Sequence, residues 1–329
     1  MPLKTVKTIY LHIGTHKTGT TSIQNFCTEN TEFLKKQGYI YPKCCWYYYG
    51  HHRIPFSLKK QKDIRRDDIP DFDTEISELK QCIDNCKEDK IVISSEEFSV
   101  LKSEAVKQLM TALNCYNVYI VLFLRRQDHL LLSIYNQQIK DFNNKKFVHY
   151  AEMKNQVSAF YPSFNYNNLV KTWEKFVGKE RMIVCLYNEE GNEAIKDFLC
   201  SIDFGEHKIA NSEVLANQSI NPKALEMVRI SKSLSLPKEK VQLFYELGLR
   251  LFKSDGSYKY LLTRKIREEI LSSFIESNTS LQKEYFPNGV VGLFDTSDME
   301  QYTEDKYQEV ILKNTDLIKV IELLLNHNA

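Results

Sequence analysis

The sequence predicts an α/β fold: a central, mostly parallel sheet with helices on both faces, which makes three layers, and a helical extension at the C-terminus. Three observations support this prediction. Strand and helix patterns alternate over about the first 200 of the 329 residues, as they do in sheets built from right-handed crossovers. The run VYIVLFL at 118–124 is apolar throughout, as expected for a strand covered on both faces. After about residue 205 helical patterns dominate.

The elements of the first part are expected in a regular order. The apolar run at 8–13 predicts a strand, and the helical spacing of apolar residues at 20–37 predicts a helix that Gly38 ends. Residues 39–73 contain three prolines and are expected to form an irregular insertion. The other expected elements are helix 74–87, strand 90–94, helix 103–114, strand 118–124, helix 127–142, helix 167–177, strand 181–187 and helix 193–201.

Two regions follow from this reading. Residues 1–205 form the predicted α/β core, with its insertion at about 39–73, and residues 206–329 form a helical extension that we expect to pack on the same domain. The helices expected in the extension are 223–232, 238–252, 263–277 and 315–326.

Composition excludes several classes of protein. With 43% hydrophobic residues the chain can build a core, so disorder is not expected. A net charge of +1 gives no reason to expect a nucleic acid partner. The eight cysteines form no C-x-x-C pair, and we expect reduced thiols without a metal site. No stretch approaches 18 apolar residues and no signal sequence is visible, so we expect no integral membrane segment and a cytoplasmic location.

The segment THKTGTTS, between the first strand and the first helix, has the composition of an anion-binding loop. Loop amides and the helix N-terminus favour negative charge at one point. Lys17 adds a positive charge, and Gly19 allows the backbone to approach an anion closely. The hydroxyl donors of the segment are Thr18, Thr20, Thr21 and Ser22. The alternative is an ordinary helix N-terminus with a hydroxyl cap and an exposed lysine.

The loop differs from the usual ATP loop, G-x-x-x-x-G-K-[ST]. Gly14 and Gly19 keep the spacing of the two glycines, but Thr20 stands where the lysine is expected, and the lysine lies at position 17. No apolar strand ends in the aspartate that would hold magnesium. The sequence therefore predicts a P-loop-like phosphate site without an obvious magnesium site.

A second candidate anchor follows the strand at 118–124. Arg125 stands at the end of this strand, and Ser133 lies almost two turns into the next expected helix. An arginine presents a planar fork of donors, which suits a second phosphate. The alternative is that Arg125 and Arg126 pair with surface acids.

Together these segments resemble two motifs of sulfotransferases that use 3′-phosphoadenosine 5′-phosphosulfate (PAPS), and most closely the bacterial-type enzymes that act on carbohydrates or lipids. THKTGTTS is similar to their 5′-phosphosulfate loop, and LRRQDHLLLS to their 3′-phosphate motif. His16 replaces the common proline of this loop, and Ser22 stands where many cytosolic members have a tryptophan. The resemblance implies PAPS as donor without a required metal. It assigns the 5′-phosphosulfate to Lys17, Gly19, Thr20 and Thr21, and the 3′-phosphate to Arg125 and Ser133. His16, Thr18 and Ser22 lie in the same loop and are also expected to contact the nucleotide.

Transfer to a hydroxyl also needs a general base and stabilisation of the leaving phosphate. Lys17 can stabilise the leaving group. Glu96 and Glu97 follow the strand at 90–94, and His51 and His52 lie in the insertion. Histidine is already poised near neutral pH, whereas a carboxylate needs a raised pKa or a very close contact. The alternative for the glutamates is the first turn of a helix capped by serine.

The aromatic residues 46–49 of the insertion have two open interpretations. They can form a platform for an acceptor, since sugars stack on such rings and bond tyrosine hydroxyls, or they can pack the insertion onto the domain.

The expected function is sulfuryl transfer from PAPS to a hydroxyl of a carbohydrate or glycolipid. The alternatives are a P-loop kinase that uses ATP and magnesium, and a nucleotide-binding protein without catalysis. A homodimer stays open.

Overall fold

The structure, a computed structural model, describes residues 6–59, 71–141, 163–188, 193–204, 220–288 and 292–327. The chain forms two compact units, each of which is discontinuous in sequence. Unit 1 comprises Met1–Arg125, Pro162–Leu215 and Ser280–Pro287, and unit 2 comprises Arg126–Tyr161, Ala216–Thr279 and Asn288–Ala329. The predicted boundary between residues 205 and 206 lies outside the described residues, and each unit is described by itself.

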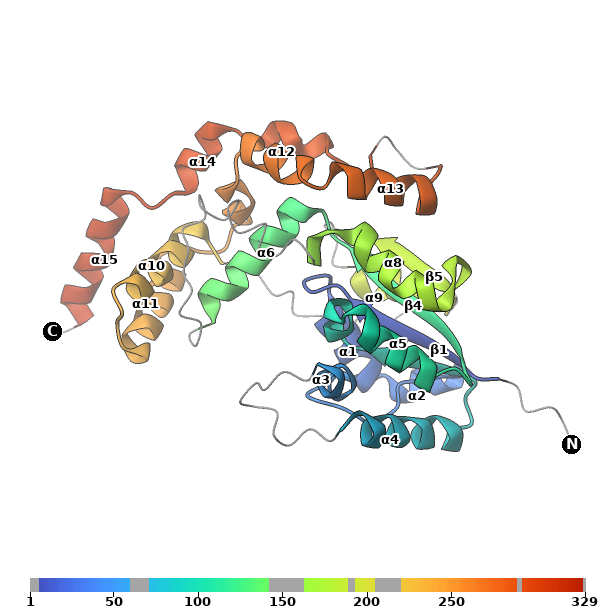
Figure 1. Cartoon of the computed structure of the whole chain (residues 1–329). Coiled ribbons are helices and arrows are strands. Elements are labelled where there is room, and N and C mark those ends of the chain that lie inside the picture. Colours follow the sequence, from blue (N-terminus) through green and yellow to red (C-terminus); the bar gives the residue numbers. More distant parts are fainter. Residues whose placement is uncertain are drawn as a thin grey trace, which may run out of the picture. The chain divides into compact units, whose positions relative to one another are not determined.

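Unit 1 contains a sheet of five parallel strands in the order β2-β3-β1-β4-β5 (Figure 1). The strands are β1 (Thr8–Gly14), β2 (Tyr39–Ile40), β3 (Lys90–Ser94), β4 (Asn117–Leu124) and β5 (Met182–Leu186). Four of them occupy predicted positions. The two-residue β2 lies in the segment predicted to be irregular, because it is too short to give an alternation signal.

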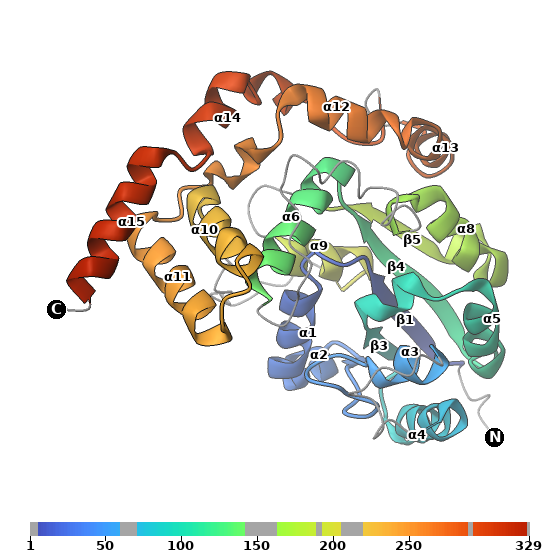
Figure 2. The ribbon, with the colours of Figure 1, turned by 60° about the vertical axis from the view of Figure 1, so that its left-hand side comes forward.

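The helices of unit 1 cover both faces of the sheet. Figure 2 shows α1 on one side and α5 on the other. The core on the α1 side joins Ile23 and Phe26 of α1 to Val121 and Phe123 of β4 and Phe198 of α9. The helices are α1 (Thr20–Glu29), α2 (Thr31–Lys36), α3 (Arg53–Leu58), α4 (Phe72–Asn85), α5 (Ser103–Ala112), α8 (Tyr166–Val177) and α9 (Ala194–Ser201). The predicted α/β class, with a parallel sheet between helices, is confirmed.

One predicted helix is two. The expected helix at 20–37 is interrupted at Asn30, where φ is −107° and ψ is 30°. The Asn30 side-chain amide donates a hydrogen bond of 2.9 Å to the Phe26 carbonyl. Asparagine competes in this way with the helical backbone pattern, which explains the break.

Unit 2 is helical in its described part, which confirms the predicted helical C-terminal part. Its elements are α6 (Gln127–Lys140), α10 (Pro222–Ser233), α11 (Lys238–Leu251), η4 (Ser257–Leu261), α12 (Arg264–Ser272), η5 (Ser297–Gln301), α14 (Glu304–Val310) and α15 (Asn314–His327). The expected helix at 263–277 is divided near Phe274, where α13 (Ile275–Tyr285) begins, and α14 was not predicted. Helix α13 continues into residues of unit 1.

Buried charges hold unit 2 together. Arg267 and Asp128 are both fully buried and form an ion pair, and Asp128 also pairs with Arg126 at 2.8 Å. Lys232 of α10 donates hydrogen bonds to the Ile139 and Asp141 carbonyls, at 2.7 and 2.8 Å, at the end of α6. A lysine at the C-terminus of a helix satisfies carbonyls that have no intrahelical partner.

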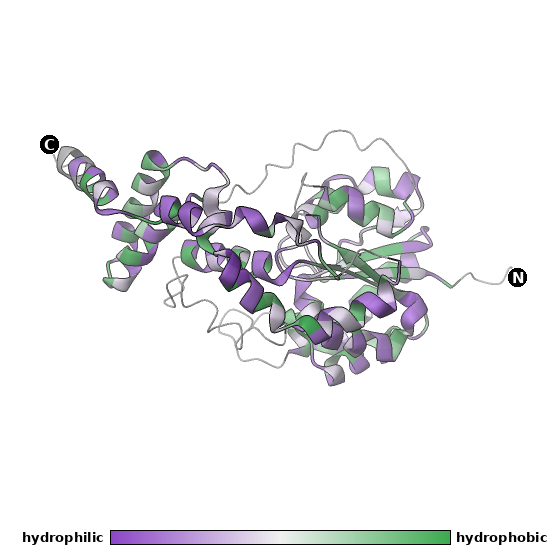
Figure 3. Ribbon diagram, turned by 90° about the horizontal axis from the view of Figure 1, so that it is seen from above, coloured by the Kyte–Doolittle hydropathy of each residue, from purple (hydrophilic) through white to green (hydrophobic). Residues whose placement is uncertain are grey.

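The hydropathy of the residues agrees with this arrangement of strands and helices. Figure 3 shows the strands of unit 1 mostly hydrophobic, whereas the helices carry both colours. In the part of the chain that the structure describes, no helix combines the length and apolar character needed to cross a bilayer.

Candidate functional site

The candidate site lies at the carboxyl ends of the central strands of unit 1. Strand β1 pairs with β3 on one side and with β4 on the other, so the segments that follow these strands meet. Ligands of open α/β sheets bind at such an edge. The Ser95 amide, after β3, donates a hydrogen bond of 3.0 Å to the His12 carbonyl of β1.

The loop after β1 has a fixed and strained shape. Lys17 has φ of 66° and Gly19 has φ of 78°, so both adopt the left-handed conformation. A non-glycine residue in this conformation costs free energy and persists only where its surroundings hold it. Arg125 holds the loop, because its Nη1 donates a hydrogen bond of 2.9 Å to the Lys17 carbonyl. The structure thus brings Lys17 and Arg125 together.

Both glycines of the loop are sterically required. A Cβ on Gly19 would lie 2.5 Å from the Ala194 Cβ. A Cβ on Gly14 would lie 2.9 Å from both Cα and Cβ of Glu96. The absence of a side chain at Gly14 therefore allows Glu96 to pack against the base of the loop.

The four predicted hydroxyl donors lie in different environments. Thr18 is fully buried and donates to the Thr15 carbonyl at 2.7 Å, so its hydroxyl shapes the loop. Thr20 is 5% exposed and donates to the same carbonyl at 3.4 Å. Thr21 is exposed and Ser22 is half-buried, in the first turn of α1.

Arg125 and Ser133 lie in different units. Arg125 is 7% exposed, its guanidinium carbon lies 5.2 Å from the Tyr187 ring centroid, and its carbonyl accepts a hydrogen bond of 2.6 Å from the Tyr166 hydroxyl. Ser133 is half-buried in α6 of unit 2. Their joint role in 3′-phosphate binding stays a prediction.

His52 and Glu96 are neighbours beside the loop. His52 Nδ1 lies 4.0 Å from Glu96 Oε2 and 2.7 Å from Ser95 Oγ. Burial lowers the pKa of His52, and the Glu96 and Glu97 carboxylates oppose this shift. His52 is therefore neutral near pH 7 and lies beside a carboxylate that can stabilise its charged form.

Gln24 was not singled out in the sequence, but it completes this pair. Its Nε2 donates hydrogen bonds of 3.2 Å to Glu96 Oε2 and 3.3 Å to Ser94 Oγ. Gln24 is 4% exposed and lies on the core-facing side of α1, next to Ile23. The sequence signal that could have identified Gln24 is a glutamine at a core position of an amphipathic helix, because a buried amide needs hydrogen-bond partners.

His51 has a different environment from His52. It is fully buried, and its Nδ1 accepts a hydrogen bond of 3.2 Å from the Ser94 amide. Nε2 lies 3.0 Å from the Pro42 carbonyl and carries the hydrogen that it donates there. Burial lowers the pKa of His51 to about 3. This geometry ties the insertion to β3, and His52 is the more suitable base of the two.

The glutamates form the first turn of a short 3₁₀ helix, η1 (Glu96–Val100). Ser95 caps it, since its hydroxyl accepts a hydrogen bond of 3.2 Å from the Glu97 amide. Glu97 forms an ion pair with Lys59. Burial alone would raise the pKa of Glu97, but Lys59 keeps it below its usual value. Glu97 is thus occupied by Lys59, whereas Glu96 faces His52.

Gly50 has no side chain, and this leaves space for the His52 ring. A Cβ on this residue would lie 2.5 Å from His52 Nε2 and 2.8 Å from Gln24 Nε2. Both contacts are shorter than van der Waals distance. The Gly50 backbone therefore packs directly against the two polar groups that adjoin Glu96.

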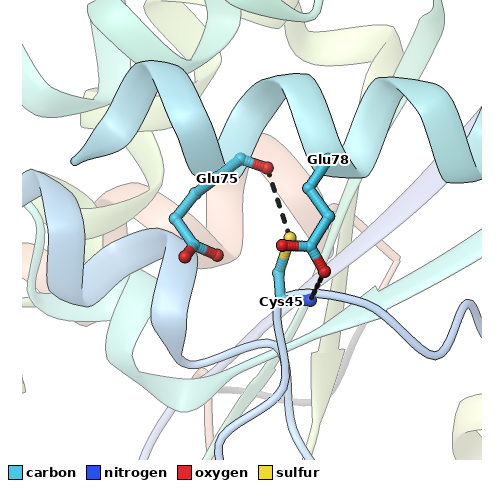
Figure 4. A group of neighbouring side chains, drawn as sticks. All are labelled: Cys45, Glu75 and Glu78. Carbon is cyan, nitrogen blue, oxygen red and sulfur yellow. Dashed lines mark hydrogen bonds between the residues drawn. The ribbon is translucent and has the colours of Figure 1, made fainter. Parts of the chain in front are cut away.

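A cluster of one thiol and two carboxylates lies at the base of the insertion (Figure 4). Ligand atoms of Cys45, Glu75 and Glu78 lie within 4.8 Å of one another. Glu78 Oε1 accepts a hydrogen bond of 3.3 Å from the Cys45 amide. Arg53 Nη2 lies 2.5 Å from Glu75 Oε1 and 3.5 Å from Glu78 Oε2. Because Arg53 already supplies positive charge, we interpret this cluster as an ion-paired anchor and not as a metal site.

No protein-family model matches the chain. A protein of Archaeoglobus fulgidus, described only as uncharacterized, is 30% identical over 203 residues, which are 60% of this chain and 54% of that protein. The chain thus spans about half the length of this curated relative.

A structural match is also distant. The crystal structure of a sulfotransferase from Alicyclobacillus acidocaldarius is similar with a TM-score of 0.42 and 12% identity, over 73% of this chain and 100% of that chain.

Proposed function

We propose that this chain is a sulfotransferase that moves a sulfuryl group from PAPS to a hydroxyl of a carbohydrate or glycolipid. One observation carries the proposal: a strained phosphate-type loop that contains Lys17 packs, through Gly14, against Glu96, which adjoins His52. The site thus combines an anion-binding loop with a candidate base, the two parts that transfer to a hydroxyl requires.

The loop would bind the donor and stabilise the leaving group. The 5′-phosphosulfate lies at the N-terminus of α1, where loop amides and the ammonium of Lys17 face the anion. As the sulfur–oxygen bond to the phosphate breaks, negative charge grows on the leaving phosphate, and these donors stabilise it. The resemblance assigns Arg125 and Ser133 to the 3′-phosphate, and Arg125 also fixes the loop through the Lys17 carbonyl.

His52 would act as the base. The acceptor oxygen attacks sulfur in line with the leaving oxygen, and the hydroxyl proton passes to His52 Nε2. Among the described residues Nε2 has no hydrogen-bond partner, whereas Nδ1 contacts Ser95. Glu96, held by Gln24, stabilises the imidazolium that forms and orients the ring.

Binding of the product nucleotide tests the role of Lys17. Adenosine 3′,5′-bisphosphate should bind without magnesium, and Lys17→Ala should weaken it about 10- to 100-fold, since a hydrogen bond to a charged group contributes about 1.5–3 kcal/mol. Isothermal titration calorimetry measures both affinities. Lys36→Ala, which removes an exposed lysine of α2, is the matched control and should bind as the wild type does.

The same titration separates the alternatives. Tighter binding of ATP, seen only with magnesium, would indicate a kinase and contradict the proposal. Nucleotide binding without transfer of labelled sulfuryl groups to any hydroxyl acceptor would indicate a non-catalytic binding protein.

Gly50→Ala tests the position of the base. The added methyl group would collide with His52 Nε2, and displacement of a catalytic group by about 1 Å costs on the order of 100-fold in rate. We expect kcat to fall by about this factor while the affinity for adenosine 3′,5′-bisphosphate is unchanged. A kcat equal to that of the wild type would remove His52 from the reaction.

A further inference from the structure

The insertion presents three consecutive tyrosines at the surface of unit 1. Tyr47, Tyr48 and Tyr49 are 38%, 78% and 53% exposed, and a backbone bridge between Tyr47 and Gly50 closes them into a tight turn. We name residues 47–50 the tyrosine turn. Trp46, which the sequence grouped with these residues, is half-buried and packs against Tyr41 and His51.

The turn is held in a strained conformation. Tyr48 has φ of 56° and Cys45 has φ of 54°, a region that bulky residues rarely adopt. The Tyr41 hydroxyl donates a hydrogen bond of 2.8 Å to the Tyr49 carbonyl, and the Cys45 amide is bound by Glu78. Strain that the surrounding structure maintains is common at ligand-binding sites. Here it projects the most exposed of the three tyrosines.

The exposed rings continue inward to the candidate base. The Tyr48 and Tyr47 ring centroids lie 4.6 Å apart, and Tyr47 and Phe56 lie 5.8 Å apart. The Phe56 ring lies 6.0 Å from the His52 ring, at an interplanar angle of 26°. We name Tyr48, Tyr47 and Phe56 the ring ladder, which connects the surface with His52.

We propose that the ring ladder binds the pyranose rings of a carbohydrate acceptor and brings one hydroxyl to His52. This inference rests on the proposed function for the identity of the reaction, but the binding surface is independent of turnover. Aromatic faces stack on the C–H faces of sugars, and the tyrosine hydroxyls can bond sugar hydroxyls.

The composition of the surface favours a sugar over a lipid chain. Within residues 44–52, all of which the structure describes, the exposed large hydrophobic side chains are the three tyrosines. An acyl chain would require an apolar groove that excludes water. Tyrosine rings that alternate apolar faces with hydroxyl groups instead match a ligand with both characters.

Binding to a glycan array tests the proposal without turnover. The wild type, saturated with adenosine 3′,5′-bisphosphate, is applied to pyranose oligosaccharides of the gluco, galacto and manno series. We expect binding to at least one of them. Tyr48→Ala and Phe56→Leu should weaken that binding by at least about tenfold, which corresponds to the loss of one stacked ring, and Tyr48→Phe should retain most of it.

Tyr49→Ala is the matched control. Tyr49 is exposed in the same turn, but the ring contacts of the ladder join Tyr48, Tyr47 and Phe56 without it, so this variant should bind as the wild type does. Absence of binding by the wild type to every oligosaccharide, or equal binding by Tyr48→Ala and the wild type, would overturn the proposal. Nucleotide affinity is measured for each variant. Absence of nucleotide binding by the wild type, with glycan binding that depends on Tyr48 and Phe56, would count against the proposed reaction and leave the ring ladder supported.

Discussion

Replacement of His52 by glutamine is expected to lower the rate of sulfuryl transfer about 10²–10⁴-fold, the usual contribution of a general base. Glutamine keeps a polar side chain beside Ser95 but cannot accept a proton from the acceptor. The conversion of PAPS to adenosine 3′,5′-bisphosphate in the presence of an acceptor measures the rate. Nucleotide affinity should be unchanged, because in the proposed mechanism His52 acts on the acceptor hydroxyl, whereas the nucleotide is bound by the loop that contains Lys17.

The pH profile distinguishes His52 from Glu96. The neutral imidazole is the active form, so kcat/KM should rise as the pH rises through the pKa of His52. Burial lowers this pKa from its usual 6.5, and we therefore expect the acid limb below pH 6.5. The limb should be absent in His52→Gln. An unchanged limb in that variant, together with full loss of activity in Glu96→Gln, would assign the base to Glu96.

Replacement of Arg53 by methionine is expected to lower the free energy of unfolding by about 3–5 kcal/mol, because it leaves a buried carboxylate without its partner. Glu75 is fully buried, and its Oε1 accepts hydrogen bonds from Arg53 Nε and Nη2 at 3.0 and 2.5 Å. Urea denaturation followed by circular dichroism measures the change.

Two further variants isolate the ion pair. Arg53→Met combined with Glu75→Leu should recover most of the lost stability, since apolar residues of similar size often replace a buried pair without loss. Arg264→Met removes an arginine that is 47% exposed and pairs with exposed Glu268 and Glu300, and it should cost less than about 1 kcal/mol. Equal losses for Arg53→Met and Arg264→Met would contradict the anchoring role of Arg53.

The sheet could be predicted from the sequence because its signals are local. Strand β4 is an apolar run of neighbouring residues, and such a run requires cover on both faces. The missed features depend on short elements or on side-chain competition. Strand β2 has only two residues, which are too few to show an alternation of apolar and polar side chains. The break at Asn30 depends on a hydrogen bond from its side chain to the backbone.

The candidate site likewise has a part that the sequence predicts and a part that only the fold reveals. Lys17 and the glycines of the loop lie in one short segment, and their chemistry is visible there. The contacts of Gln24 with Glu96, of Gly50 with Gln24 and of Arg53 with Glu75 join residues that are separated in the chain. Apolar periodicity cannot identify such pairs, because the fold alone brings them together.

Unit 1 consists of three separate segments of the chain, and this affects the design of shorter expression fragments. The last piece of this unit, Ser280–Pro287, is encoded after most of unit 2. Within this segment Glu284 forms an ion pair with Lys171 of α8. The Tyr285 hydroxyl donates a hydrogen bond of 2.7 Å to Glu174 of the same helix. An expression fragment that stops before Ser280 therefore encodes an α/β unit that lacks one of its own parts. Crystallisation or labelling of the sheet region on its own would require a redesigned chain and not a single cut.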